Sequence, residues 1–248
     1  MIILSVLFFI TAFLYSSVGF GGGSTYLALM LIWDIPYYIF PTIALFCNII
    51  VVSGNSINYI KSGNLNFKLL IPYLIGSIPF AFYGASLQIS KNVFEIILFF
   101  ILTIAGAMLL VKSRSLNNKE FKINKISKIF SVLIGSVIGF FSGLVGIGGG
   151  IFLSPILFLI KAGYPKQIAT SASLFILINS IFGVAGQFTK DIVFDKFFDF
   201  WPLFLAVLIG GQIGNFLNIK FLSNKILALI TSLLVLFVAT RMGLRLMS

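Results

Sequence analysis

Long apolar segments with almost no charged residues are the feature that most restricts how this chain of 248 residues can fold. Hydrophobic residues make up 59% of the sequence and charged residues 9%, whereas a soluble domain carries about 25% charged residues. A water-soluble fold of this size could not cover so much apolar surface. The apolar segments lie near residues 2–33, 36–60, 66–88, 92–111, 126–160, 166–189, 197–219 and 223–247. We therefore predict an all-α polytopic protein of the cytoplasmic membrane, with about eight hydrophobic segments of roughly 20 residues each.

The two halves of the chain resemble each other. The glycine-rich run GFGGG at residues 19–23 has a counterpart, GIGGG, at residues 146–150, which is 127 residues later. Further along, Pro72 and Gly84 have counterparts 130 residues later in Pro202 and Gly214. Internal duplication with a glycine-interrupted segment at the same place in each half is typical of membrane transporters.

This duplication predicts two homologous repeats of four segments each. The first membrane repeat is expected at residues 1–112 and the second at residues 126–248. A basic linker at residues 113–125 joins them, in the most polar stretch of the sequence. An excess of cations marks cytoplasmic loops, so we expect the linker to be cytoplasmic.

The first and fifth segments are unusual because each exceeds 30 residues and contains a glycine run. They are too long for one membrane crossing and too short for two, so each is expected to be broken or re-entrant at its glycine-rich kink. Single crossings place both termini in the cytoplasm, whereas re-entrant hairpins place both outside and make the repeats inverted. In both arrangements 12 of the 17 cations share the linker's side and 5 lie opposite. Inverted repeats are common among transporters, which favours the second arrangement without excluding the first.

The glycine runs are the candidate binding site. Glycine brings the backbone close to a ligand, and a helix that starts after each run offers unpaired N–H groups and the positive end of its dipole. Together these features predict a cradle for a small anion that needs no basic side chain. Close packing of helices on small residues is the alternative explanation. The candidate residues are Gly21, Gly22, Gly23, Ser24, Thr25, Gly148, Gly149, Gly150 and Ile151.

Three hydroxyl residues complete the predicted site. Thr170 and Ser171 are expected at the start of a helix, where backbone N–H groups are free, and Thr42 is the corresponding threonine in the first half. Other polar residues in the segments, such as Asn48 and Asn55, would either line the anion path or form hydrogen bonds between helices.

Several function classes are excluded by composition. The sequence has no histidine and a single cysteine, Cys47, so we expect no disulfide within the chain, no metal site, no cofactor and no enzyme activity. Neither glycine run fits a nucleotide-binding pattern. The net charge is +11, and the basic residues lie between the apolar segments. They therefore indicate membrane topology and contacts with lipid headgroups. We expect no nucleic-acid binding. The expected partners are a small anionic substrate and the lipid bilayer, and the oligomeric state stays open.

At these residues the sequence resembles a known family. The paired runs GFGGG at 19–23 and GLVGIGGG at 143–150, the following Pro155 and the Ala169-Thr170-Ser171 element are similar to the signatures of the sulfite exporter TauE/SafE family. The first half departs from the pattern, because Ala28 stands at the position of Pro155 and residues 41–43 read PTI. The resemblance implies a permease for sulfite, sulfonates and other organosulfur or carboxylate anions.

The sequence therefore predicts a secondary transporter, an exporter of small anions that binds its substrate near mid-membrane. A channel-like anion pore is the alternative. Because no charged residue is expected deep within a segment, we also expect that transport is not coupled through a buried titrating side chain. The membrane potential could then drive the efflux of a monovalent anion.

Overall fold

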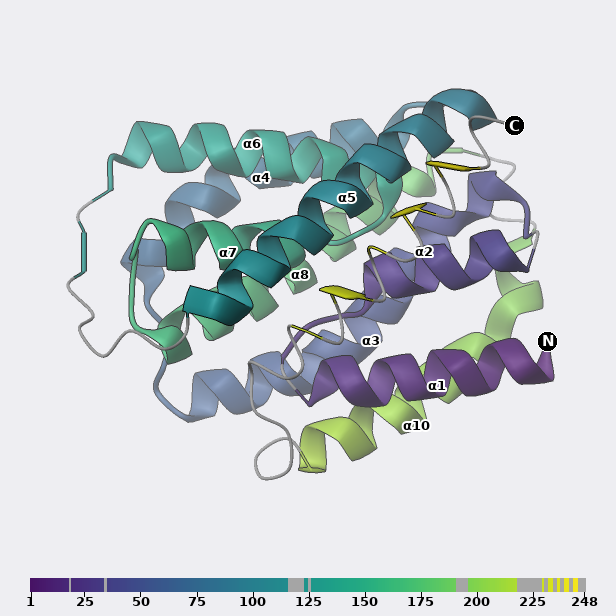
Figure 1. Ribbon diagram of the computed structural model, residues 1–248, viewed down its shortest axis with the longest axis horizontal. Helices are drawn as coiled ribbons and strands as arrows, with labels where there is room; N and C mark the ends of the chain where they lie inside the picture. Colours follow the sequence, from purple (N-terminus) through teal and green to yellow (C-terminus); the bar gives the residue numbers. More distant parts are fainter. Residues whose placement is uncertain are drawn as a thin grey trace.

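The structure, a computed structural model, describes residues 1–17, 19–33, 35–115, 123–124, 126–190 and 196–217, and isolated positions between 229 and 244. Every secondary-structure element in these ranges is helical (Figure 1). The prediction of an all-α protein is confirmed for this part of the chain. The predicted eighth segment at 223–247 and most of the predicted linker fall outside the described residues.

Among the described residues, five helices are long and apolar enough to cross a membrane. They are α3 (Phe40–Lys61, preceded by the 3-10 turn η1, Tyr37–Ile39), α4 (Phe67–Ser86), α5 (Lys91–Ser115), α6 (Lys128–Val145) and α8 (Pro165–Gln187). These lengths support a multi-pass membrane protein. Helix α5 continues three residues into the region that the sequence analysis assigned to the linker.

Each of the two overlong segments divides into two helices. The first segment divides into α1 (Ile2–Ser16) and α2 (Gly23–Ile32), and the fifth into α6 and α7 (Gly150–Leu159). The seventh segment contains η2 (Phe198–Phe200) and α10 (Trp201–Leu217). Each break falls at a glycine run.

Helices α1 and α2 form a hairpin with both outer ends at one end of the helix bundle. Met1 and Trp201 line one cavity there, and Ile35, just after α2, lines another with Lys91 at the start of α5. The hydroxyl of Tyr15 in α1 lies 2.7 Å from that of Thr25 in α2. In Figure 1, α1 and α2 therefore return the chain toward the end that carries the N-terminus.

Helices α6 and α7 form a second hairpin that opens at the opposite end. Asn124, before α6, donates through its side chain to Ile160 O at 3.1 Å and through its backbone to Lys161 O at 3.0 Å, both after α7. Gly163, just after α7, lies beside the start of α4, because a Cβ on it would be 3.1 Å from Leu69. Helix α4 is about 30 Å long at 1.5 Å per residue. It therefore runs from the end of the bundle where α7 ends to the end that carries the N-terminus. The hairpins thus enter from opposite ends, as in the re-entrant arrangement.

The two halves of the chain interlock through close helix contacts. Helix α6 packs on α4, and α1 packs on α10 (Figure 1). The backbone of Gly84 in α4 touches Phe140 O in α6, and that of Gly214 in α10 touches Phe13 O in α1. Glycine allows such contacts because no side chain separates the backbones.

The outer surface of the bundle is apolar. Leu133 and Val137 of α6 are exposed, as are Ile71 and Ile75 of α4. A continuous apolar surface of this kind is unfavourable in water and matches a lipid environment. Polar side chains are instead buried between the helices, where the candidate site lies.

Candidate functional site

The helices α2 and α7 both begin at a glycine in the left-handed region. Gly22, which precedes α2, has φ +90°, and Gly149, which precedes α7, has φ +78°. This conformation is costly for any residue with a Cβ, and it turns the chain sharply into each helix. The glycine runs therefore fix where the two short helices start.

The first amides of these helices are unpaired. The N–H of Thr25 donates to Gly22 O at 2.9 Å, which is the first turn of α2. Within the described residues, no group accepts a hydrogen bond from the N–H of Gly23 or of Gly150. Each helix start thus presents free donors and the positive end of the helix dipole.

The two glycine runs meet around Asn48 of α3. The Asn48 Nδ2 donates to Ile147 O at 3.1 Å. A Cβ on Gly23 would lie 2.7 Å from Asn48 Nδ2 and 2.8 Å from Ile147 O, and a Cβ on Gly148 would lie 2.8 Å from the same Nδ2. Gly21 packs against the Oδ1 side of the amide. One side chain therefore contacts both runs, although they lie more than 120 residues apart in the sequence.

The second half supplies an apolar side chain at the corresponding place. Gly150 packs against Ile176 of α8, and a Cβ on Gly148 would lie 2.9 Å from Ile176 and 3.0 Å from the Ser180 Oγ. Asn48 and Ile176 each lie beside the first residue of the short helix in their own half. The site is consequently asymmetric, with an amide on one side and a branched aliphatic group on the other.

The predicted site residues are only partly brought together. The nine residues from the glycine runs and helix starts are all buried, but only Gly21, Gly23 and Gly148 lie against Asn48 of α3, whereas Gly149 and Gly150 pack against α8. Thr42 lies six residues before Asn48 on α3, and Ser171 five residues before Ile176 on α8. Because α3 and α8 enter from opposite ends of the bundle, these hydroxyls lie on opposite sides of the meeting point.

The expectation that Thr170 and Ser171 lie at the start of a helix is wrong. Helix α8 begins at Pro165, and the Gln167 Oε1 accepts from the Tyr164 N–H at 3.3 Å. A proline is favourable at the first helical position because it needs no N–H partner, so the helix begins a turn earlier. The Thr170 hydroxyl donates to Lys166 O at 2.8 Å, within its own helix.

Several buried polar atoms in the interior have no hydrogen-bond partner. They include Asn48 Oδ1, both amide atoms of Asn55, and the hydroxyls of Ser24, Thr42, Ser171 and Ser180. A buried polar group without a partner costs roughly 1–3 kcal/mol. Of these residues, Asn48 and Ser180 lie against the glycine runs and Ser24 directly follows the first run.

The sequence analysis left Asn48 open between lining the anion path and packing, and it did not include Asn48 or Ser180 among the candidate site residues. The relevant signal was present, because Asn48 is a polar residue in an apolar segment. The contact of Asn48 with Ile147 and Gly148 of the other half depends on how α3 packs against the two hairpins. A local sequence pattern does not predict packing between distant helices. The interior is otherwise neutral: among the described residues, the one buried charged side chain is Glu95, in α5 beside Lys91 at 3.9 Å.

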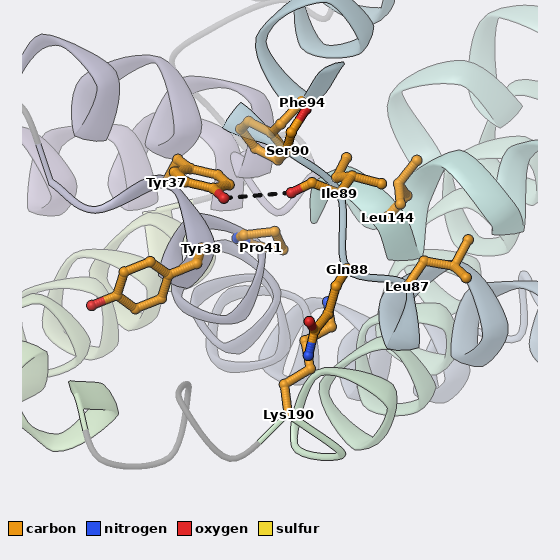
Figure 2. Close-up of a pocket in the computed structure, with 10 residues that line it drawn as sticks. All are labelled: Tyr37, Tyr38, Pro41, Leu87, Gln88, Ile89, Ser90, Phe94, Leu144 and Lys190. Atoms are coloured by element: carbon orange, nitrogen blue, oxygen red, sulfur yellow. Dashed lines mark hydrogen bonds between the residues drawn. The ribbon is translucent and has the colours of Figure 1, made fainter. Parts of the chain in front are cut away.

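A surface cavity of about 590 Å³ adjoins the second glycine run (Figure 2). It lies at the end of the bundle that carries the N-terminus. Its lining residues include Pro41 and Leu144, and the backbone of Pro41 touches Gly146 at the start of that run. The remaining lining residues are Tyr37, Tyr38, Leu87, Gln88, Ile89, Ser90, Phe94 and Lys190.

Comparison with known proteins gives consistent matches. Residues 4–242 match the family described as "Sulfite exporter TauE/SafE". The chain is 30% identical over 235 residues to "Probable membrane transporter protein y4hK" of Sinorhizobium fredii, covering 94% of each chain. It is 32% identical over 199 residues to "Probable membrane transporter protein MJ0441" of Methanocaldococcus jannaschii, covering 76% of this chain and 73% of the relative.

A third relative is "Probable membrane transporter protein YunE" of Bacillus subtilis. It is 26% identical over 265 residues, covering 95% of this chain and 94% of the relative. No solved structure matches the chain.

Proposed function

Because the chain belongs to the sulfite exporter TauE/SafE family, we propose that it is a secondary transporter that exports small anions such as sulfite, sulfonates or related organosulfur and carboxylate compounds. Its relatives are named probable membrane transporter proteins, and the family description together with the neutral interior supports the proposed substrate class. The observation that carries the proposal is the meeting of the two glycine runs, each followed by a helix whose first N–H is unpaired, at one buried amide, Asn48.

The anion would be bound by neutral donors. Its donors would be the free N–H groups of Gly23 and Gly150 and the amide of Asn48. A sulfite, sulfonate or carboxylate group has several oxygen atoms that can accept from both helix starts at once. Backbone amides and helix dipoles stabilise an anion at such places, and they hold it less tightly than a buried cation would. Weak binding of this kind favours release, which a transporter requires.

We further propose that the two halves are inverted repeats that act on the anion from opposite sides. The opposed α1–α2 and α6–α7 hairpins support this arrangement. The paired contacts of Gly84 with Phe140 and of Gly214 with Phe13 relate positions that the repeat alignment matches, at spacings of 130 and 127 residues. Alternating access would expose the meeting point first to one side and then to the other.

The driving force would be the membrane potential. A monovalent anion that leaves a negative interior gains about 2.3 kcal/mol at 100 mV, which corresponds to roughly a 50-fold gradient. The charged residue buried among the described helices, Glu95, lies beside Lys91 near the start of α5, away from the glycine runs. A buried proton carrier at the site is therefore no part of this proposal.

Flux measurements on proteoliposomes would test the function. Purified protein would be reconstituted with labelled sulfite or methanesulfonate inside, and efflux would be followed under a potential set by potassium and valinomycin. We expect saturable, voltage-driven flux that shows counterflow. Linear flux without counterflow would support the anion pore instead. Absence of flux for sulfite, sulfonates and carboxylates would contradict the proposed function, and flux that follows pH but ignores voltage would contradict the proposed driving force.

A further inference from the structure

The cavity beside the second glycine run has a distinct polar composition. It is formed by the start of α3, the loop between α4 and α5, and the ends of α6 and α8. Figure 2 shows the Lys190 side chain extending from the end of α8 toward the α4–α5 loop, from which the Gln88 side chain extends in return. The Tyr37 hydroxyl donates to Ile89 O at 3.5 Å and braces this loop.

Lys190 is fixed to the hairpin that carries the second glycine run. Its Nζ donates to Gln187 Oε1 at 3.1 Å, and Gln187 Nε2 donates to Gly143 O at 3.3 Å in the last turn of α6. Gln187 is fully buried. An ammonium group has three donors, so this contact leaves two for a ligand in the cavity.

Within the part of the chain that the structure describes, Lys190 has no acidic partner. Lys91 and Glu95 line the adjoining cavity, and they lie 3.9 Å from each other. Burial lowers the pKa of Lys190 to about 8. A partly buried cation that no described acidic residue neutralises is unfavourable on its own, and an anion in the cavity would relieve that cost.

We propose that this cavity is a vestibule in which the transported anion binds to Lys190 before entering or after leaving the glycine-lined interior. The inference rests on the proposed function and adds a second binding place to it. The occupant is a small soluble anion with a sulfonate, sulfite or carboxylate group, whose oxygens accept from the Lys190 ammonium and the Gln88 amide. The vestibule ends at Leu144 and Pro41, and Pro41 touches Gly146. Only the turn between α6 and α7 therefore separates an anion in the vestibule from the glycine-lined interior.

Charge-selective labelling tests the vestibule without requiring transport. Gln88→Cys would be introduced with Cys47→Ala, and its reaction with the impermeant sulfonate reagent 2-sulfonatoethyl methanethiosulfonate would be compared with that of the trimethylammonium analogue. We expect the anionic reagent to be favoured. Lys190→Gln should lower the anionic-to-cationic rate ratio by roughly tenfold, as one charge a few ångströms away changes a barrier by about 1.4 kcal/mol in a medium of intermediate dielectric.

Matched variants separate this electrostatic effect from a structural one. Lys91→Gln removes the same charge from the adjoining cavity and should leave the ratio nearly unchanged, while Lys190→Arg should retain the wild-type ratio. If Cys47→Ala prevents folding, Gln88→Cys can be labelled in the otherwise native chain, because Cys47 is fully buried. A ratio that does not respond to Lys190→Gln would overturn the vestibule.

Two further experiments identify which anion occupies the cavity. Methanesulfonate should slow labelling in vesicles of phosphatidylcholine, and equal protection by phosphatidylglycerol vesicles without methanesulfonate would assign the cavity to lipid headgroups and overturn the proposal. In proteoliposomes, Lys190→Gln should raise the KM several-fold for anion presented at the Lys190 side only. A charge-selective cavity in a protein without flux would contradict the proposed function, whereas normal flux with no change in either assay would contradict the vestibule alone.

Discussion

Asn48 shows how one side chain can connect two distant parts of the sequence. It is held by the carbonyl of Ile147 and lies against Gly21 and Gly23. A hydrogen bond between membrane helices stabilises the protein by only about 0.6 kcal/mol on average, so packing alone gives little reason for an amide here. Its Oδ1 is buried without a partner, which is costly. Under the proposed function, an anion would accept from the second hydrogen of the Asn48 Nδ2, which gives a reason for the amide; the Oδ1, which can only accept, gains no partner from an anion.

Substitution of Asn48 should impair transport more than folding. We expect Asn48→Ala to raise the KM for sulfite or methanesulfonate ten- to hundredfold, because a hydrogen bond to a charged group is worth about 1.5–3 kcal/mol. Asn48→Asp should abolish flux, since its carboxylate repels the anion. Proteoliposome flux measures both effects. Asn179→Ala is the matched control, because the Asn179 Nδ2 donates to Phe175 O within its own helix at 2.8 Å; an equal loss in this control would assign Asn48 to packing.

Lys190 should make anion uptake at its own side depend on pH. The lowered pKa of about 8, caused by burial, means that the ammonium is present at pH 7 and largely lost at pH 9. We expect the KM for methanesulfonate on that side to rise several-fold across this interval, while Lys190→Arg removes the dependence. The other titratable groups that line these cavities are Tyr37, Tyr38 and the Lys91–Glu95 pair. A sulfonate keeps its charge throughout, so a persisting pH dependence in Lys190→Arg would contradict this assignment.

At the scale of elements, the important property of the short helices α2 and α7 is where they begin. Helices of ten residues are too short to cross a membrane. Irregular backbone at this depth is tolerated where it is buried in protein or lines a cavity. Because each hairpin turns back inside the bundle, both helix starts are buried, with Gly23 beside Asn48 and Gly150 beside Ile176. In the proposed function, these two helix starts together would form one binding place.

The glycines before α2 and α7 should tolerate no side chain. An alanine in the left-handed region costs roughly 1–2 kcal/mol, and the added Cβ at Gly149 would also lie 2.8 Å from Ile138 and Phe175. At Gly22 the nearest atoms would lie 3.1 Å away. We expect Gly149→Ala to lower both thermal stability and flux more than Gly22→Ala, and valine at either position to abolish flux while the protein still inserts.

Gly63 provides the control for this series. It has φ +70° but lies in a loop where an added Cβ meets nothing within 4 Å. Gly63→Ala should therefore show the conformational cost in a thermal denaturation experiment and retain wild-type flux. If valine at both Gly22 and Gly149 leaves flux normal, the glycine runs serve helix packing and do not contact the anion.

For the whole molecule, the opposed hairpins determine which surfaces face each side of the membrane. Lys61, Lys68, Lys128, Lys161 and Lys166 lie at the end of the bundle near α7's outer end, whereas Lys91, Lys190 and Lys196 lie at the end with the N-terminus. From the positive-inside rule we expect the first end to be cytoplasmic. The proposed vestibule would then open to the outside, where an exporter would release its substrate.

Cysteine labelling in intact cells checks this orientation. In a Cys47→Ala chain, Gln88→Cys should react with an impermeant maleimide added outside, and Gly63→Cys should react only after the cells are permeabilised. The two loops lie at opposite ends of α4, so they report on opposite sides. Labelling of Gly63→Cys in intact cells would reverse the assignment and make the vestibule a cytoplasmic entrance.

The sequence alone determined the class of fold and the places where helices break. Segments without charges require a lipid environment, and the glycines at 19–23 and 146–150 mark the breaks because only glycine adopts their backbone conformation at low cost. Both are local properties, and local composition records them. The start of α8 was misjudged, since Pro165 already begins the helix before Thr170.

Tertiary structure decided whether the broken segments cross or return, and which residues the two runs contact. Charge counts could not choose, because both arrangements divide the 17 cations as 12 and 5. The choice depends on packing between distant helices, such as Gly84 on Phe140 and Gly214 on Phe13. The same packing brings Asn48 between the runs and anchors Lys190 to α6 through Gln187. These contacts join residues far apart in the chain, and their energies exist only once the helices are assembled.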